Sequence, residues 1–269
     1  PYYDCYVPQI KAAGGIPKFV RLSAPDWQVT EELLRPAFSD KTKLIILNTP
    51  MNPAAKVFSK DELSIIAKLL IEFDAYAVCD EVYEHLVFDD KKHIPLMALD
   101  GMRERCVRIG SAGKTFSFTG WKIGYVTAAP HLLGPIASAH QFVTFTTPPV
   151  FQYPIARGLL TVDDYFHGLV AEMDKGRQQL SKGLQEIGFG VLPCEGTYFL
   201  TVDISPLNTG KDDVDFCEWI TKEAKVAAIP MSVFYNNDGE NPPPKNLARF
   251  CFAKREEILS TAILRLKEF

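Results

Sequence analysis

Two kinds of apolar pattern alternate along the first half of the chain. Short, continuous runs rich in branched residues, typical of strands buried on both faces, lie at residues 43–47, 76–79, 106–109 and 123–126. Between the first two runs, apolar residues recur at the spacing of one helix face, at Leu63, Ile66, Ala67 and Leu70. Ser59, with Glu62 three residues later, is a capping-box pattern that starts this helix. Strands alternating with helices predict an α/β fold with a mostly parallel sheet and helices on both faces.

The pattern changes near Tyr165. A long helical repeat of apolar residues runs from Leu169 to Leu184. Strand-like runs follow at residues 198–202, 226–229 and 247–252, and a last helical pattern extends from Glu256 to Phe269. These elements predict a separate, smaller α+β domain. We therefore expect a large domain over residues 1–164 and a C-terminal domain over residues 165–269.

Composition and charge disfavour several classes of function. The 269 residues carry a formal net charge of −4 and no stripe of Lys and Arg, which argues against nucleic-acid binding. No apolar run reaches the roughly 18 residues that suggest a membrane span. The six cysteines form no C-x-x-C pair and the five histidines show no metal-binding spacing. This favours reduced thiols in a cytoplasmic protein and no metal site.

Polar residues follow the predicted strands of the large domain, at Asn48, Asn52, Asp80 and Ser111. Ligands of parallel α/β sheets bind beyond the carboxyl ends of the strands. We therefore expect the chemistry of the protein to gather around these residues.

The segment G-S-A-G-K-T, residues 110–115, places Lys114 just after a predicted strand. Its end resembles a phosphate-binding loop, but that motif needs a glycine where Arg108 stands. A serine-nucleophile motif fails too, because G-x-S-x-G would require glycine in place of Ile109. A free lysine has a pKa of about 10.4, so keeping its amine neutral at pH 7 costs about 4.6 kcal/mol. Holding the nitrogen as an imine with an aldehyde cofactor such as pyridoxal phosphate avoids that cost and supplies an electron sink.

Four motifs, in this order, point to a known family: N-x-x-x-N-P from Asn48 to Pro53, D-E-V-Y from Asp80 to Tyr83, S-A-G-K-T from Ser111 to Thr115, and T-G-W-K-I-G from Thr119 to Gly124. The chain resembles the fold-type I, class I pyridoxal-phosphate aminotransferases. Within them it is most similar to the branch of kynurenine aminotransferase, glutamine transaminase K and methionine aminotransferase. P-Y-Y-D-C-Y-V-P at the start and A-R-F-C-F-A-K near the end extend the likeness over most of the chain. The resemblance implies the family's fold and pyridoxal 5'-phosphate as cofactor.

The resemblance also implies roles around the cofactor ring. Lys114 would form the internal aldimine and, once displaced by substrate, carry the proton between substrate and cofactor. Asp80 would pair with the protonated ring nitrogen. Asn52 and Tyr83 would hydrogen-bond the ring's 3′ oxygen, and Tyr3 would stack on the ring.

Further residues would hold the phosphate and the substrate. By the same resemblance, Ser111 and Lys122 would contact the cofactor's phosphate. Arg249 would bind the substrate carboxylate through two hydrogen bonds, for which the planar guanidinium is suited, and Asn48 would assist it. Phe145 would line the side-chain pocket of a neighbouring subunit.

Each role has a structural alternative. Lys114 could be an ordinary solvated lysine, although its place in a small-residue loop argues against exposure alone. Asp80 could cap a helix, and Arg249 could form a structural ion pair. Tyr83 and Phe145 could be core aromatics.

The implied activity is amino transfer from a methionine-like, glutamine-like or aromatic amino acid to a 2-oxo acid, in a homodimer. Ala54-Ala55 replaces the family's usual T-G, which slightly favours methionine and aromatic substrates. One alternative on the same scaffold is β-elimination from cysteine S-conjugates. Another is an inactive fragment or a non-catalytic homologue.

The start of the chain also carries an expectation. The chain begins at Pro1, in the motif that contains the ring-stacking tyrosine. The family's glycine-containing phosphate loop, which would lie upstream at a helix start, is a major anion site. We expect a polypeptide that begins at Pro1 to be incomplete and, alone, to bind the cofactor poorly.

Overall fold

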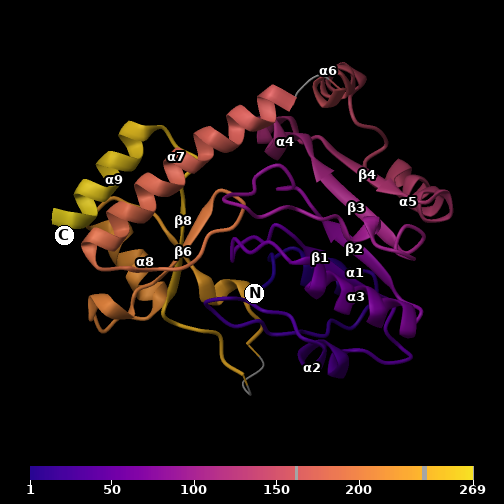
Figure 1. Ribbon diagram of the computed structural model, residues 1–269, viewed down its shortest axis with the longest axis horizontal. Coiled ribbons are helices and arrows are strands. Elements are labelled where there is room, and N and C mark those ends of the chain that lie inside the picture. Colours follow the sequence, from indigo (N-terminus) through magenta and orange to yellow (C-terminus); the bar gives the residue numbers. More distant parts are fainter. Residues whose placement is uncertain (161–162, 238–240, 269) are drawn as a thin grey trace. The chain divides into compact units, whose positions relative to one another are not determined.

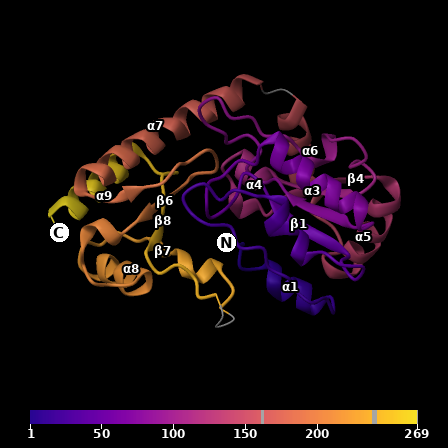
Figure 2. The same cartoon turned by 60° about the horizontal axis from the view of Figure 1, so that its bottom comes forward.

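The computed structural model describes residues 1–160, 163–237 and 241–268, which form two compact units (Figures 1 and 2). Unit 1 comprises Pro1–Gln28, Met51–Lys56 and Leu169–Phe269, and unit 2 comprises Val29–Pro50 and Val57–Gly168. Two early segments thus group with the C-terminal part of the chain. This division differs from the two continuous domains expected from the sequence, whose boundary at 164/165 stays a prediction.

Unit 2 contains a four-stranded sheet in the order β1-β2-β3-β4 (Figure 1). Its strands are β1 (Leu44–Asn48), β2 (Tyr76–Asp80), β3 (Cys106–Ser111) and β4 (Gly124–Ala128). The first three are parallel, and β4 pairs with β3 in the antiparallel direction. Only a one-turn helix, α4 (Ala112–Thr115), and a 3₁₀ turn (Thr119–Trp121) join β3 to β4, and so short a connection suits an antiparallel return. The expected α/β fold with a mostly parallel sheet is confirmed.

The helix between β1 and β2 forms as its sequence pattern predicts. Helix α3 (Lys60–Glu72) begins after Ser59, whose hydroxyl accepts a hydrogen bond from the Glu62 amide at 3.2 Å. The Glu62 carboxylate accepts in return from the Ser59 amide at 2.8 Å, completing the capping box. All four residues of the expected apolar face are buried. Unit 2 also contains α2 (Glu31–Leu34), α5 (Pro130–Val143) and α6 (Pro149–Leu160).

Glycine is required at position 110 because an aromatic ring occupies the space beside it. Gly110 and Tyr125 are register partners on β3 and β4. A Cβ atom at Gly110 would lie 2.1 Å from Cε2 of Tyr125. The ring is also held at its far end, where the Tyr125 hydroxyl donates to the Glu84 carboxylate at 3.0 Å.

We expect Gly110→Ala to destabilise the protein by about 1–3 kcal/mol, because overpacking displaces the ring or the strand. Gly120→Ala is the matched control, since nothing lies within 4 Å of a Cβ atom there. Urea unfolding of both variants measures the difference. Equal unfolding midpoints for the two variants would show that the Tyr125 ring does not constrain position 110.

Unit 1 contains an antiparallel sheet in the order β5-β6-β8-β7. Its strands are β5 (Gly190–Val191), β6 (Phe199–Asp203), β7 (Ile229–Pro230) and β8 (Leu247–Cys251), and its helices include α1 (Tyr6–Ala12), α8 (Asp213–Lys222) and α9 (Glu256–Glu268). The long helix α7 (Asp163–Ile187) contains the division between the units. The last helix forms as expected, with Phe269 outside the described residues.

The strand expected at 226–229 is mostly wrong, because β7 begins only at Ile229 and pairs with β8 over two residues. Of the preceding residues, Val226 and Ala228 are buried and Ala227 is exposed. The Val226 amide donates to the Ile220 carbonyl at 3.3 Å, which ties this connection to the end of α8. Pro230 lacks the N–H that a longer ladder would need.

All six cysteines are free thiols, and four of them are buried: Cys79, Cys106, Cys194 and Cys217. The pKa of the Cys79 thiol is raised, first by its hydrogen bond with Cys106 and then by burial. Burial raises the pKa of Cys217 to about 12. Both shifts favour the protonated thiol at Cys79 and Cys217, which is a weaker nucleophile than the thiolate. Among the described helices, none has the length and apolar character to cross a membrane.

Candidate functional site

The carboxyl ends of the three parallel strands in unit 2 bring polar residues to one edge of the sheet. Asn48, Asp80 and Ser111 are the last residues of β1, β2 and β3. The Asn48 amide group donates to the Asp80 carbonyl at 2.9 Å and so joins the first two strand ends. The Asp80 carboxylate accepts from the Val82 amide at 3.4 Å and is half-buried. Three of the four polar residues expected at the strand ends therefore end neighbouring strands, whereas Asn52 belongs to unit 1.

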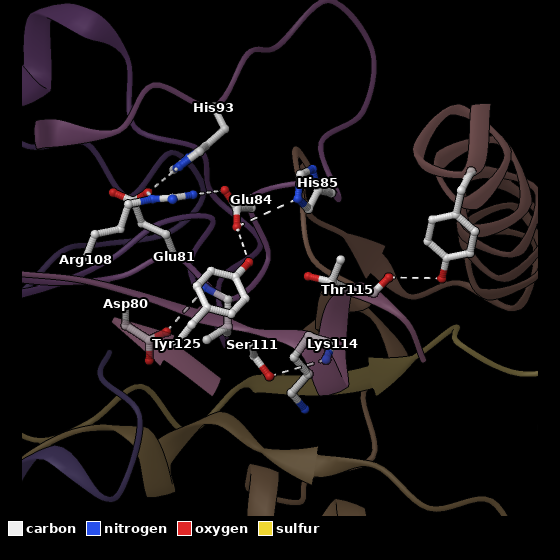
Figure 3. A network of polar contacts seen from close by, with 12 residues as sticks. Asp80, Glu81, Glu84, His85, His93, Arg108, Ser111, Lys114, Thr115 and Tyr125 are labelled. Atoms are coloured by element: carbon white, nitrogen blue, oxygen red, sulfur yellow. Dashed lines mark hydrogen bonds and ion pairs between the residues drawn. The ribbon is translucent and has the colours of Figure 1, made fainter. Parts of the chain in front are cut away.

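Lys114 lies in α4, directly after β3 (Figure 3). Ser111 is the N-cap of this short helix, and its hydroxyl accepts a hydrogen bond from the Lys114 amide at 3.3 Å. The Lys114 side chain is half-buried, and its Nζ lies 5.8 Å from the centre of the buried Tyr83 ring. The strand and the cap thus fix the backbone at residue 114, and the half-buried amine lies near the Tyr83 ring, which argues against an ordinary solvated lysine.

The loop after Lys114 turns back tightly on α4. A Cβ atom at Gly113 would lie 2.9 Å from the Cα of Thr119, so the two backbones approach closely there. The Thr119 hydroxyl donates to the Gly113 carbonyl at 3.2 Å. Lys122 follows with a left-handed backbone (φ 55°) and an exposed side chain. The cation expected to bind a phosphate therefore belongs to the same short connection as Ser111 and Lys114.

The side chains of unit 2 fit pyridoxal phosphate by their chemistry. Asp80 is a half-buried carboxylate, which suits a protonated ring nitrogen. Lys114 supplies an amine for the aldehyde, and Tyr83 a phenol beside that amine. The Ser111 hydroxyl and the Lys122 cation are donors of the kind that a phosphate needs.

In unit 1, Arg249 on β8 is enclosed by two aromatic rings. Its Cζ lies 4.0 Å from the centre of the Phe199 ring and 4.8 Å from that of Phe234. Its Nη1 donates to Oδ1 of the buried Asn52 at 2.5 Å. The two rings and the Asn52 amide restrict the orientation of the half-buried, planar guanidinium. A fixed orientation is what recognition of a carboxylate by two parallel hydrogen bonds requires.

Tyr3 and Phe145 are two expected site residues whose aromatic side chains are exposed. Tyr3 is partly exposed and makes an edge contact with Tyr6, with ring centres 6.0 Å apart. Phe145 is 77% exposed, and its left-handed backbone (φ 67°) follows the end of α5. Phe145 is therefore not a core aromatic of its own chain.

Sequence reasoning missed a polar network in unit 2 that adjoins Asp80: Glu81, Glu84, His93, Arg108 and Tyr125 (Figure 3). Two signals were present in the sequence. Glu81 follows Asp80 in an otherwise apolar segment, and Arg108 interrupts an apolar strand. A buried charge requires a partner, so these two charges were candidates for pairing with each other.

Comparison with known proteins gives matches over the whole chain. The model of the family "Aminotransferase class I and II" matches residues 1–265. Methionine aminotransferase of Escherichia coli is 39% identical over 268 residues, which cover 100% of this chain and 68% of the relative. Human kynurenine–oxoglutarate transaminase 3 is 37% identical over 287 residues, covering 97% of this chain and 63% of the relative.

Solved structures agree. An Escherichia coli protein identified as having a methionine aminotransferase function superposes with a TM-score of 0.94 and 38% identity, over 100% of this chain and 69% of that structure. N-succinyldiaminopimelate aminotransferase from Mycobacterium tuberculosis superposes with a TM-score of 0.92 and 36% identity, with the same coverage. The chain thus spans about two thirds of the length of the relatives it matches.

Proposed function

The chain belongs to the class I and II aminotransferase family, and from that premise we propose that the protein moves amino groups from an amino acid to a 2-oxo acid with pyridoxal phosphate. One observation carries this proposal. A half-buried lysine, Lys114, follows the strand next to the one that ends in the Asp80 carboxylate. One cofactor that carries a ring nitrogen and an aldehyde requires a carboxylate and an amine, and here these follow from adjacent strands: Asp80 ends β2, and Lys114 lies in the short helix after β3. The cofactor, when bound, supplies an electron sink for the substrate's Cα.

We assign roles to the residues of unit 2. Lys114 binds the cofactor and moves a proton at the substrate's Cα. Asp80 holds the proton on the ring nitrogen through its negative charge. Tyr83 donates to the ring's 3′ oxygen, while Ser111 and Lys122 bind the phosphate.

In unit 1 we assign substrate binding to Arg249, which orients the amino acid by its carboxylate. Asn52, the hydrogen-bond partner of Arg249, binds the ring's 3′ oxygen, and Tyr3 stacks on the ring. Asn48 of unit 2 assists the substrate carboxylate. The amide of Asn52 and the rings beside Arg249 support this assignment, because they fix the guanidinium before any substrate arrives.

The names of the relatives indicate which substrates to test. They include methionine aminotransferase and kynurenine–oxoglutarate transaminase. We propose methionine-like, glutamine-like or aromatic donors and a 2-oxo acid acceptor. The test is to incubate the full-length protein with each donor and a 2-oxo acid, and to measure the amino acid formed from the acceptor. Failure with every donor in cofactor-loaded protein would reject amino transfer.

β-Elimination from a cysteine S-conjugate is the rival activity, and it is not favoured. The relatives named above are all described as amino-transferring enzymes. The two activities are separated by their products, since elimination releases pyruvate and ammonia. We expect amino transfer to exceed elimination for the same protein.

We propose that the protein is a homodimer. A set of apolar side chains along α5, α6 and the segment between them is exposed in the single chain: Phe142, Val143, Phe145, Val150, Tyr153 and Leu160. Phe142 alone is 87% exposed. Exposed apolar patches of this kind mark interaction sites, and a second copy that covers them would receive Phe145 near its substrate. Light scattering of the full-length protein tests the oligomeric state.

We also propose a cytoplasmic location. All six cysteines are free thiols, which is usual in a reducing compartment. Cell fractionation would test the location directly.

We expect Arg249→Lys to raise KM for the amino acid by about 10- to 100-fold, because a lost hydrogen bond to a charged group costs about 1.5–3 kcal/mol. Lysine keeps the charge but loses the planar fork and the stacking on Phe199. Arg255→Lys is the control, because Arg255 is exposed and lies between β8 and α9. Steady-state kinetics with methionine distinguish the two, and an unchanged KM in Arg249→Lys would remove this residue from substrate binding.

A further inference from the structure

A network of charged side chains lies next to Asp80 and takes no part in the roles assigned above (Figure 3). Glu81 accepts from Nε of Arg108 at 2.6 Å and contacts Nε2 of His93 at 3.0 Å. The other end of the Arg108 guanidinium contacts the Glu84 carboxylate. Glu84 accepts in turn from the Tyr125 hydroxyl at 3.0 Å. One arginine therefore bridges two carboxylates that lie three residues apart in the chain.

The burial of this network is costly. The Glu81 side chain is 0% exposed, and those of His93, Arg108 and Glu84 are mostly buried. Within the described part of the chain, Oε1 of Glu81 and Nδ1 of His93 are buried without a hydrogen-bond partner. A buried ion pair with unsatisfied atoms contributes little to stability compared with apolar packing. Stability is thus a poor explanation of why the charges are there.

The position of the network in the sheet suggests a different role. The ladder between β2 and β3 ends at the pair Asp80–Ile109, with a last hydrogen bond from the Glu81 amide to the Ile109 carbonyl at 2.9 Å. Beyond that point β3 continues to Ser111, paired only with β4. The Glu81–Arg108 ion pair therefore joins β2 and β3 just where the main-chain pairing stops.

We propose that Glu81 and Arg108 are positioning residues, whose ion pair holds the Asp80 carboxylate and the Lys114 amine in the fixed relation that one cofactor needs. This inference rests on the proposed function. Glu81 follows Asp80 directly, and Arg108 lies on the strand that leads through Ser111 to Lys114. Side chains around a reacting centre must be held within about 0.5 Å of their working geometry, and a cross-strand ion pair supplies that restraint.

Charge supports the same role. Two buried carboxylates beside Asp80 would oppose its own negative charge if nothing balanced them. Arg108 lies between both and offsets their effect. Other titratable groups that face the network include the Cys79 thiol, which interacts electrostatically with Glu81 and Arg108, the Tyr125 hydroxyl, and the imidazoles of His85 and His93. The pKa of His85, stacked on Phe166 at 3.9 Å, is lowered by burial and then by His93.

The test uses the full-length protein loaded with pyridoxal phosphate. Glu81→Gln removes one charge without changing shape, and Arg108→Lys keeps the charge but cannot reach both carboxylates. We expect each variant to weaken cofactor affinity by about tenfold or more and to lower kcat/KM by about 10- to 100-fold. We also expect the pH midpoint of the cofactor's visible absorption, which reports deprotonation of its imine, to rise. If Asp80 is displaced, the ring nitrogen holds its proton less well, so the ring withdraws less electron density from the imine and the imine keeps its proton to higher pH.

Asp174→Asn is the matched control, because it breaks a partly buried ion pair to Arg177 (2.7 Å) in unit 1. That variant should lower the melting temperature and leave the pH midpoint unchanged. Wild-type affinity and midpoint in Glu81→Gln and Arg108→Lys would overturn the proposal, whatever their melting temperatures. If neither variant folds, Glu81→Asp decides. It keeps the charge but shortens the side chain that reaches Arg108, and an unchanged midpoint there also overturns the proposal.

The failure of the proposed function would look different. Borohydride reduction of the wild-type protein with pyridoxal phosphate should attach the cofactor to Lys114, as read by peptide mapping. Unlabelled Lys114 in the full-length wild type would reject both proposals. Labelled Lys114 with an unchanged midpoint in the variants would reject the positioning role alone.

Discussion

Replacing Lys114 by alanine should abolish amino transfer and leave the fold intact. Loss of the proton-transferring group alone lowers kcat by about 10²–10⁴-fold, and the lost attachment of the cofactor adds to this. The fold should survive because the side chain is half-buried and the cap of α4 uses the backbone amide of residue 114, which alanine retains. Amino transfer from methionine and circular dichroism measure the two effects.

Lys114→Arg is the companion variant. Arginine keeps a positive charge near Tyr83, but its guanidinium stays protonated and forms no imine with the cofactor's aldehyde. We therefore expect Lys114→Arg to be as inactive as Lys114→Ala. Activity near that of the wild type in either variant would show that another amine carries the chemistry. Added methylamine should partly restore Lys114→Ala, because a small free amine can accept the proton in the vacated space.

Asp80→Asn should have the second-largest effect, with a fall in kcat of about 10²–10³-fold. That range is typical when one preorganised electrostatic partner of the reacting groups is removed. Asparagine retains the shape and the hydrogen bond from the Val82 amide, but it lacks the charge that keeps a proton on the ring nitrogen. The measurement is kcat with methionine at saturating pyridoxal phosphate.

Two further variants show whether the Asp80 effect is specific. Asp80→Glu retains the charge and should recover part of the activity. Asp90→Asn, at an exposed position of the same unit, should match the wild type. Equal activity of Asp80→Asn and Asp90→Asn would refute the role of Asp80.

The parts of the fold that the sequence predicted are those with a local cause. The capping box at Ser59 and the apolar face of α3 depend on residues a few positions apart, and both form as expected. The antiparallel direction of β4 depends on the short connection that follows β3, and the early end of β7 depends on Pro230, which has no N–H to donate. Neither feature appears in the apolar pattern from which the strands were predicted. The helices α5 and α6 carry prolines inside them and many exposed apolar residues, so no single buried face identifies them.

The site shows the same difference. Asn48, Asp80 and Ser111 could be placed at one edge because they end neighbouring parallel strands, while their roles stay predictions. The ion pair between Glu81 and Arg108 could not be predicted in this way, because the two partners are 27 positions apart in the chain. Lys122 was singled out by the resemblance alone, and its role stays a prediction. The close approach of Gly113 and Thr119 folds the connection back on α4 and could not be read from the apolar pattern.

The ring of Tyr125 over Gly110 has an evolutionary consequence, which is epistasis between the two positions. A larger residue at 110 becomes tolerable only after the ring at 125 is replaced by something smaller. That first replacement removes the hydroxyl that binds Glu84 and so disturbs the network beside Asp80. Each single step is disadvantageous, so lineages of this enzyme should change the two positions together or keep both.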